Sequence, residues 1–315
     1  MSNGSDTTPD SPNAARAPRN PDTGPPDPAP RPPLTSESNP RVRRVVRLRK
    51  SAGAEGRRAS GLFLCEGARE VSRAVAAGIE QEEVFVLTDA EAGSDVAEAA
   101  AAAEASGAQR YDVSDRVLRK MSYHREPEGV LAVARRPATE VDALPPARPC
   151  GVWLVAVGTA KPGNLGAMVR TADALGCDAV IAAGAPVDPF HPNAIRASTG
   201  AVFSMPLAVC EPQRGIDALR ERGVRVLAFT VDAEEVLPEL AERLRREQSP
   251  PIAAVIGPED KGLCETWVRA AKGSGGAAVR IETARRVTDS LNASVAAAIA
   301  LYELTHVRRQ GDRIS

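Results

Sequence analysis

The chain has 315 residues with a formal net charge of −1, 26 prolines and five cysteines. This length allows about two domains, and a charge sum near zero gives no sign of a polyanionic partner by itself. The cysteines are scattered and show no CxxC spacing, which excludes a disulfide framework and argues against a zinc or other metal site. The sequence shows no signal segment and no apolar run of about 18 residues, so we expect a cytoplasmic protein without membrane contact.

Residues 1–38 contain a dense run of proline with polar residues, as in PDTGPPDPAPRPPL. They carry almost no large apolar side chain, so burial cannot offset the entropy of ordering them. We therefore expect a disordered, Pro-rich tail that samples extended conformations and has no part in an active site.

Residues 39–136 alternate short apolar runs with helical patterns. Strands are expected at 61–67, 82–87 and 129–136, and helices at 68–78, 95–106 and 114–122. The pattern predicts a small α/β domain, followed by a proline-rich linker at 137–150.

Residues 151–309 begin with GVWLVAVG, a continuous apolar run typical of a strand buried on both faces of a parallel sheet. Helix and strand patterns then alternate to the final helix at 290–309, and residues 310–315 are expected to be a tail. The order predicts an α/β fold, a sheet with helices on both faces.

A basic cluster, RVRRVVRLRK, lies at 41–50 and has six cations in ten residues. Such a cluster can neutralise phosphates of RNA by displacing counterions. It is equally well explained as the solvated face of a helix whose valines point inward. The candidate RNA-binding residues are Arg41, Arg43, Arg44 and Arg47.

Ligands of open α/β sheets bind beyond the carboxyl ends of the strands, so loops that follow apolar runs are the candidate sites. GTAKPGNLGAMVR at 158–170 is neither a Walker loop nor a dinucleotide fingerprint. We expect Asn164 and Arg170 near the start of its helix, where Arg170 can contact a phosphate. The alternative is that Asn164 caps the helix and Arg170 forms a surface ion pair.

Two later loops offer further polar side chains. IGPEDKGL at 256–263 places Glu259 after a strand, although a turn around Pro258 explains the pattern equally well. DSLNASVAAAIALYE begins the last helix with Ser290, Asn292 and Ser294, where backbone amides favour a polar or anionic ligand. Helix capping alone requires fewer such residues.

In this order and spacing, the three segments NLGAMVRTADALG, IGPEDKGL and DSLNASVAAAIALYE resemble the three motifs of the SpoU (TrmH-type) branch of the SPOUT RNA methyltransferases. IRASTGAVFSMPL also resembles a family segment, so the resemblance covers 151–309. GLFLCEGAREV and PEGVLAVAR resemble the family's ribosomal-protein-like substrate-binding domain. The resemblance therefore extends to about residue 39.

The resemblance implies a C-terminal SPOUT domain with a deep trefoil knot that binds S-adenosylmethionine, and a homodimer with its active site near the subunit interface. It implies methylation of a ribose 2′-hydroxyl in structured RNA, and a separate recruiting domain favours ribosomal RNA. Asn164, Arg170, Glu259, Ser290 and Asn292 match catalytic positions, whereas Gly257, Ile281 and Leu291 match cofactor-binding positions. We expect Arg170 to grip RNA, oriented by Glu259, Ser290 and Asn292.

The chain departs from the family in one loop. The family has Ile-Pro-Met followed by Gly, whereas this chain has Ile281, Glu282, Thr283, Ala284 and Arg285. Arg285 is expected to crowd the cofactor. This departure motivates a rival hypothesis, a non-catalytic RNA-binding protein that keeps the fold, and a nucleotide-binding α/β enzyme of another kind is a further alternative.

Overall fold

Strand β1 (Leu62–Glu66) shows how the first sheet is built, because its side chains alternate between two faces. Leu62 and Leu64 belong to one apolar core, and Phe63 and Cys65 to the other. The computed structural model describes residues 1, 32–50, 53–247, 250–284 and 290–311, and the described residues after 32 form one compact unit.

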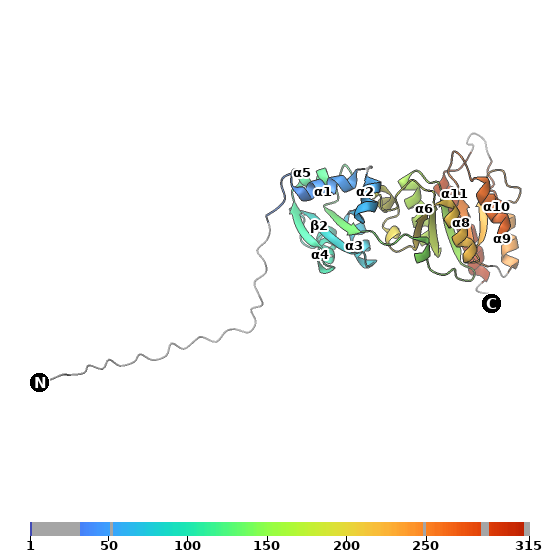
Figure 1. The fold of residues 1–315 in the computed structure, drawn as a ribbon, viewed down its shortest axis with the longest axis horizontal. Coiled ribbons are helices and arrows are strands. Elements are labelled where there is room, and N and C mark those ends of the chain that lie inside the picture. Colours follow the sequence, from blue (N-terminus) through green and yellow to red (C-terminus); the bar gives the residue numbers. More distant parts are fainter. Residues whose placement is uncertain (2–31, 51–52, 248–249, 285–289, 312–315) are drawn as a thin grey trace. The chain divides into compact units, whose positions relative to one another are not determined.

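The first sheet has four strands in the order β1-β4-β2-β3. Strand β4 is antiparallel to β1 and β2, whereas β2 and β3 are parallel. Helices α1 and α5 cover one face, and α3 and α4 cover the other (Figure 1). The bounds of these elements and of the short helix α2 are α1 Pro40–Arg49, α2 Gly53–Ser60, α3 Ala68–Ala76, β2 Gln81–Leu87, α4 Asp95–Ala105, β3 Gln109–Val113, α5 Asp115–Met121 and β4 Val130–Arg135.

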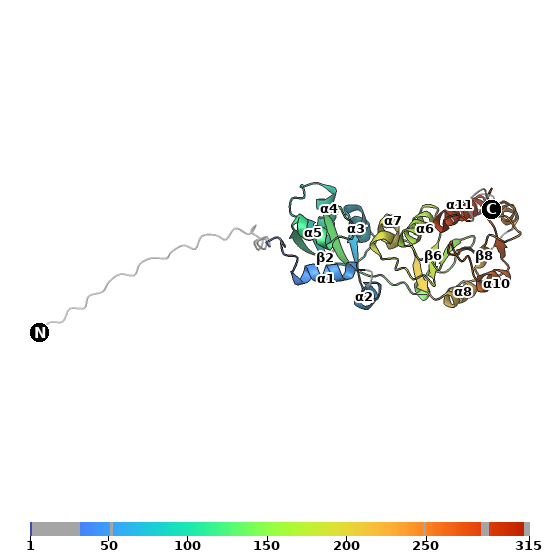
Figure 2. The ribbon, with the colours of Figure 1, turned by 90° about the horizontal axis from the view of Figure 1, so that it is seen from above.

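The second sheet has six strands, all parallel, in the order β10-β8-β9-β5-β6-β7. It lies between α6 and α11 on one side and α8 and α10 on the other (Figure 2). The fold is therefore α/β with a parallel sheet flanked by helices, as expected. The bounds are β5 Val152–Val157, α6 Pro162–Ala174, β6 Ala179–Ala183, α7 Pro192–Ala197, β7 Leu207–Cys210, α8 Pro212–Glu221, β8 Arg225–Phe229, α9 Leu237–Arg246, β9 Ile252–Ile256, α10 Glu265–Gly273, β10 Ala277–Val279 and α11 Ala293–Gly311.

The segments around the sheets differ from the expectation in three places. Leu34, expected in the disordered tail, pairs with Val113 because β3 is an edge strand with backbone groups to satisfy. The linker contains a 3₁₀ turn, η1 (Val141–Ala143), and its Thr139 carbonyl accepts a bond of 2.8 Å from the backbone N–H of Val209 at the other sheet's edge. Helix α11 continues beyond 309 into the expected tail.

A buried cluster of charged side chains connects the region of the first sheet to the segment that precedes α7. Arg57 of α2 donates to Asp188 at 2.8 Å, and Arg136 donates to the other carboxylate oxygen at 2.6 Å. Arg57 is 1% exposed. The ring of Phe63 packs at 5.1 Å from that of Phe190, so one apolar core continues from the first sheet to the α7 region.

Within the described part of the chain, every helix is too short or too polar to span a bilayer. The trefoil knot would involve the segment between β10 and α11. Residues 285–289 of that segment lie outside the described residues, so the knot stays a prediction.

Candidate functional site at the carboxyl ends of the parallel strands

Glu259 is the centre of a polar cluster that joins the three loops. Its Oε1 accepts a bond of 3.0 Å from Asn164 Nδ2 of α6 and another from Asn292 Nδ2. The backbone N–H of Ala293, the first residue of α11, donates to the same oxygen at 3.1 Å. Lys161 Nζ lies 3.3 Å from Oε2. One carboxylate therefore accepts hydrogen bonds from the side-chain amides of Asn164 and Asn292, which lie at the starts of α6 and α11.

Sheet topology explains why these residues meet. Strands β5 and β9 are parallel neighbours, so the segments that follow them leave the sheet at the same end. These segments are the start of α6, with Asn164, and the loop with Glu259. Helix α11 packs against both strands and against α6. Its first residues are thus brought beside Glu259.

The charge of Glu259 is stabilised where it lies. The Ala293 N–H is the largest cause that lowers the pKa of Glu259; desolvation opposes it, and Lys161 and Asn164 add to the lowering. The side chain is 28% exposed. It is therefore an ionised hydrogen-bond acceptor at neutral pH, and a poor base.

A cavity of about 410 Å³ lies beside this cluster. Apolar side chains of Ile256, Ile281 and Leu291 line it, and Glu259 and Ser290 lie at its wall. The backbone folds tightly here: a Cβ on Gly257 would lie 2.7 Å from the carbonyl carbon of Gly262. All three predicted cofactor-binding residues, Gly257, Ile281 and Leu291, line this cavity.

Arg170 stands apart from the cluster, which corrects one expectation. Helix α6 begins at Pro162, so Arg170 lies in its third turn rather than near its start. Six residues along a helix give about 9 Å of rise and directions about 120° apart. Arg170 is exposed, and no hydrogen bond in the described residues of this chain joins it to Glu259, Ser290 or Asn292. Glu259 instead holds Asn164 and the backbone at the start of α11.

The loop that differs from the family pattern lines the cavity without filling it over its described residues, 281–284. Ile281 and Thr283 line the cavity, and Glu282 is exposed. Arg285, expected to crowd the pocket, lies outside the described residues. Residues 281–284 belong to no helix or strand, so a sheet does not use their backbone polar groups.

The predicted RNA-binding arginines are not equivalent. Arg41 and Arg44 form ion pairs with Glu83, and Arg44 also pairs with Glu82. Arg43 and Arg47 are exposed, one helical turn apart on α1. The basic cluster thus presents fewer unpaired cations than its sequence indicates.

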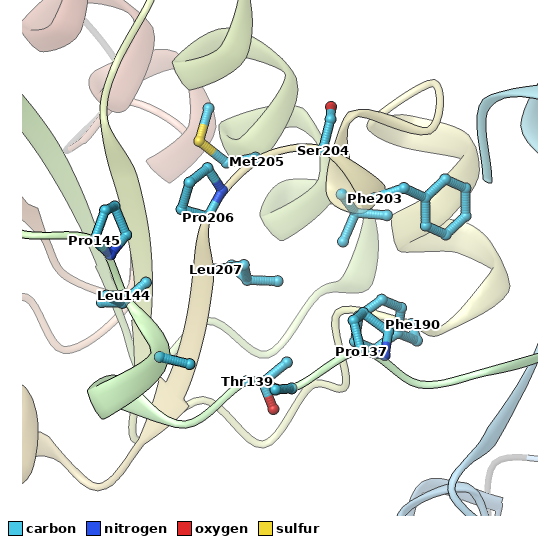
Figure 3. Close-up of a pocket in the computed structure, with 13 residues that line it drawn as sticks. Pro137, Thr139, Leu144, Pro145, Phe190, Phe203, Ser204, Met205, Pro206 and Leu207 are labelled. Atoms are coloured by element: carbon cyan, nitrogen blue, oxygen red, sulfur yellow. The ribbon is translucent and has the colours of Figure 1, made fainter. Parts of the chain in front are cut away.

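A second hollow, of about 370 Å³, lies between the linker and the edge of the second sheet (Figure 3). Its labelled lining includes Pro137, Leu144 and Pro145 of the linker and Phe203, Pro206 and Leu207 of the segment that leads into β7. It is mostly apolar and holds no charged side chain, so it lacks the groups that bind a charged substrate. The described residues also contain no cluster of His, Cys, Asp and Glu able to hold a metal ion.

Sequence reasoning missed Lys161, whereas Ser294 belongs to the polar cluster expected at the start of the last helix. Lys161 precedes α6 in the GTAKPGNLG segment, and its charge beside a Gly/Pro-rich loop was an available signal. Ser294 donates its hydroxyl proton to Asn292 Oδ1 at 2.6 Å and its backbone N–H to the same oxygen at 3.0 Å. These bonds fix the Asn292 amide with its Nδ2 toward Glu259.

Comparison with known proteins shows the family of the chain. The sequence model of the SpoU rRNA methylase family matches residues 151–302, and that of the MRM3-like substrate binding domain matches residues 39–132. A crystal structure described as an RNA 2′-O ribose methyltransferase is 37% identical, with a TM-score of 0.72, and covers 88% of this chain and 99% of its own. The chain belongs to the SpoU rRNA methylase family.

Two further relatives of this SpoU protein come from Streptomyces viridochromogenes. The SpoU methyltransferase AviRb, solved in complex with AdoMet, is 26% identical with a TM-score of 0.74, over 88% of this chain and 99% of its own. The 23S rRNA (uridine(2479)-2′-O)-methyltransferase is 32% identical over 59% of this chain and 62% of its own length. The fold is that of SPOUT methyltransferases.

Proposed function

We propose that this SpoU family protein methylates a ribose 2′-hydroxyl of ribosomal RNA in the cytoplasm, with S-adenosylmethionine as methyl donor. The observation that carries the proposal is the Asn164–Glu259–Asn292 cluster at the wall of a cavity lined by Gly257, Ile281 and Leu291. Relatives described as 2′-O-methyltransferases of 23S rRNA support the choice of RNA.

The cavity fits the cofactor by size and chemistry. Its 410 Å³ is within the range of small-molecule sites. Apolar side chains suit a purine ring, the unpaired stretch 281–284 offers backbone groups to its edge, and the acidic groups of Glu259 and Asp232 suit a positive sulfur. Gly257, Ile281 and Leu291 would hold the cofactor.

The reaction is an attack by a ribose oxygen on a methyl carbon, which demands positioning and removal of the hydroxyl proton. When bound, S-adenosylmethionine supplies a methyl group activated by its positive sulfur. Glu259 holds the amides of Asn164 and Asn292 in place, and these amides position the target nucleotide. Ser290 shapes the pocket wall.

Arg170 grips the RNA rather than acting as a base, because arginine side chains keep their proton in proteins. Its guanidinium is suited to a forked contact with a phosphate and to polarising the hydroxyl. The hydroxyl proton then passes to that phosphate or to water.

A homodimer would complete the site. Three apolar side chains on α11 are exposed at helical spacing: Val295 (46%), Ile299 (39%) and Tyr302 (60%). Helix α11 packs against α6, which carries the exposed Arg170. We infer that these helices form the dimer face, and that Arg170 of one protomer reaches RNA bound at the site of its partner.

Calorimetric titration with S-adenosylmethionine tests the cofactor site. The protein should bind it, and Leu291→Arg should abolish binding because a charged side chain would fill the apolar wall. Arg43→Ala, on the first sheet's helix, is the control and should bind as the parent does. If the parent protein does not bind the cofactor at millimolar concentration, the non-catalytic RNA-binding hypothesis replaces the proposal.

A further inference from the structure

Tyr123 is an exposed aromatic residue in the turn that follows α5, where 39% of its surface is accessible. Glu66, the last residue of β1, fixes this turn by hydrogen bonds. Its carboxylate accepts 2.7 Å bonds from the Ser122 hydroxyl and from the Tyr123 backbone N–H. The backbone under the ring is therefore fixed by the sheet.

Three rings gather at this turn. The Tyr123 ring lies nearly perpendicular to those of His124 and His191, with centroids 5.4 Å and 5.1 Å away. The Tyr123 hydroxyl accepts a bond of 3.3 Å from Asn193 Nδ2 of α7. A ring in contact with two imidazoles and held at its hydroxyl has little freedom to move, so a ligand that stacks on its exposed part loses little entropy in ordering it.

Basic side chains lie on the element beside this turn. Helix α1 packs against α5 (Figure 1), and Arg49 at its end donates to the carbonyls of Lys120 at 3.0 Å and Ser122 at 2.8 Å. Arg43 and Arg47 are exposed on the same helix, and Arg125 is exposed two residues after Tyr123. Acidic groups are also near: Glu128 pairs with Arg196 at 3.5 Å, and Glu126 lies close enough to Arg119 to affect its pKa.

We propose that Tyr123 is a stacking platform for one unpaired base of the RNA, whose neighbouring phosphates lie along Arg43 and Arg47. An exposed, preorganised ring next to cations is the combination that binds single-stranded RNA, because every base has a face that can stack. A base in a duplex is already stacked and cannot reach the ring. The inference rests on the proposed function for its choice of RNA, and it assigns a residue that selects unpaired nucleotides.

The competing explanation is structural. Tyr123 also connects the turn to α7 through Asn193. Removing its side chain would loosen this contact even if no base stacks on the ring. Tyr123→Phe separates the two explanations: it keeps the stacking face and removes the hydroxyl that Asn193 contacts. Tyr123→Trp also keeps an aromatic face and adds a fluorescent probe at the site.

The experiment measures binding of oligo(A), as a single-stranded probe, and of an RNA duplex of the same length. Tyr123→Ala should bind the single strand about 5-fold to about 150-fold more weakly, the range for losing one stacked base, and the duplex as before. Tyr123→Phe should bind the single strand as the parent does. The fluorescence of Tyr123→Trp should be quenched by the single strand and not by the duplex. Equal binding of oligo(A) by parent and Tyr123→Ala, or absence of quenching, would overturn the proposal.

Methyl-transfer assays distinguish this inference from the proposed function. With undermethylated ribosomal RNA, Tyr123→Ala should raise the KM for RNA and leave the affinity for S-adenosylmethionine unchanged. If the parent transfers no methyl group yet oligo(A) binding still depends on the ring, the proposed function fails and the stacking site stands. If the parent is active and Tyr123→Ala has the parent's KM, the stacking site fails and the function stands.

Discussion

Asn164 and Glu259 are joined by a hydrogen bond of 3.0 Å between Asn164 Nδ2 and Glu259 Oε1, although 95 residues separate them in the chain. The bond connects the first turn of α6, the helix that follows β5, to the loop after β9. Asn292 donates to the same oxygen, so a third segment, before α11, is held at the same point. The site depends on one carboxylate that three segments share.

Replacing Glu259 should therefore disorganise the site without unfolding the sheet. In Glu259→Gln an amide replaces one acceptor oxygen, and we expect methyl transfer to fall at least about a hundredfold, as when one fixed polar contact in an active site is lost. Steady-state kinetics with undermethylated ribosomal RNA measures this. Activity equal to the parent's would show that the cluster does not position substrate.

The lowered pKa of Glu259 predicts that the stability of the protein depends on pH in the acidic range. Because the folded protein lowers the pKa of Glu259 below its usual value of 4.5, ionised Glu259 stabilises the fold fully above that value. This contribution is lost as the pH falls through the lower pKa of the folded state. Urea unfolding between pH 6 and pH 3 should show a weaker pH dependence in Glu259→Gln than in the parent. Parallel curves would contradict the assigned charge.

Mixed dimers test the position of Arg170. Arg170→Ala and Glu259→Gln should each be nearly inactive alone, and Arg170→Ala should keep the parent's stability because the side chain is exposed. If Arg170 acts in its partner's site, mixing the two variants restores about a quarter of the parent activity, since half the dimers are mixed and each has one intact site. Absence of recovery, with exchange of protomers verified, would place Arg170 in the site of its own chain.

Salt dependence distinguishes the arginines of α1. Neutralising Arg43 or Arg47 should reduce the slope of log K against log salt for single-stranded RNA by about 0.7 each, because each would release one phosphate's counterion. Arg44→Ala is the matched control: Glu82 and Glu83 already neutralise Arg44, so the slope should change little. Equal effects of all three variants would refute this division.

The buried ion cluster makes a prediction about stability. Burial opposes ionisation of Asp188, but Arg136, Arg57 and the Phe190 N–H together lower its pKa below the usual value. Asp188→Ala leaves the buried Arg57 uncompensated and should cost about 3–5 kcal/mol of unfolding free energy. Asp115→Ala, which breaks the exposed pair with Arg119, should cost far less, because solvent screens this pair. Urea unfolding compares the two, and similar losses would contradict the account.

Periodicity predicted most of the helices and strands but missed β3 and β7, and the resemblance predicted which loops meet. The apolar run 151–158 corresponds to β5, which is buried throughout, and the Ala-rich segment 95–106 corresponds to α4. Each of these segments carries one unbroken pattern, apolar in β5 and helix-forming in α4. The cavity beside Gly257 followed from motif positions. Local sequence patterns were sufficient to predict an element wherever the pattern of its own buried residues determines whether it is a helix or a strand.

Long-range partners were not predictable from the residues. The charges at 41–50 give no sign that Glu82 and Glu83 would pair with Arg41 and Arg44, because a strand some forty residues away supplies them. The place of Arg170 depended on where α6 begins, which its Gly/Pro-rich start obscured. The Arg57–Asp188 pair crosses 131 residues and leaves no local signal.

The central claim is transfer of a methyl group to a ribose oxygen, and the most direct measurement is the location of the label. The protein is incubated with undermethylated ribosomal RNA and S-adenosylmethionine tritiated in its methyl group, and the RNA is digested to nucleosides. The account predicts tritium in a single 2′-O-methylribonucleoside, and none with the Arg170→Ala variant. Tritium on a base, or RNA without label although the protein binds the cofactor, would contradict it.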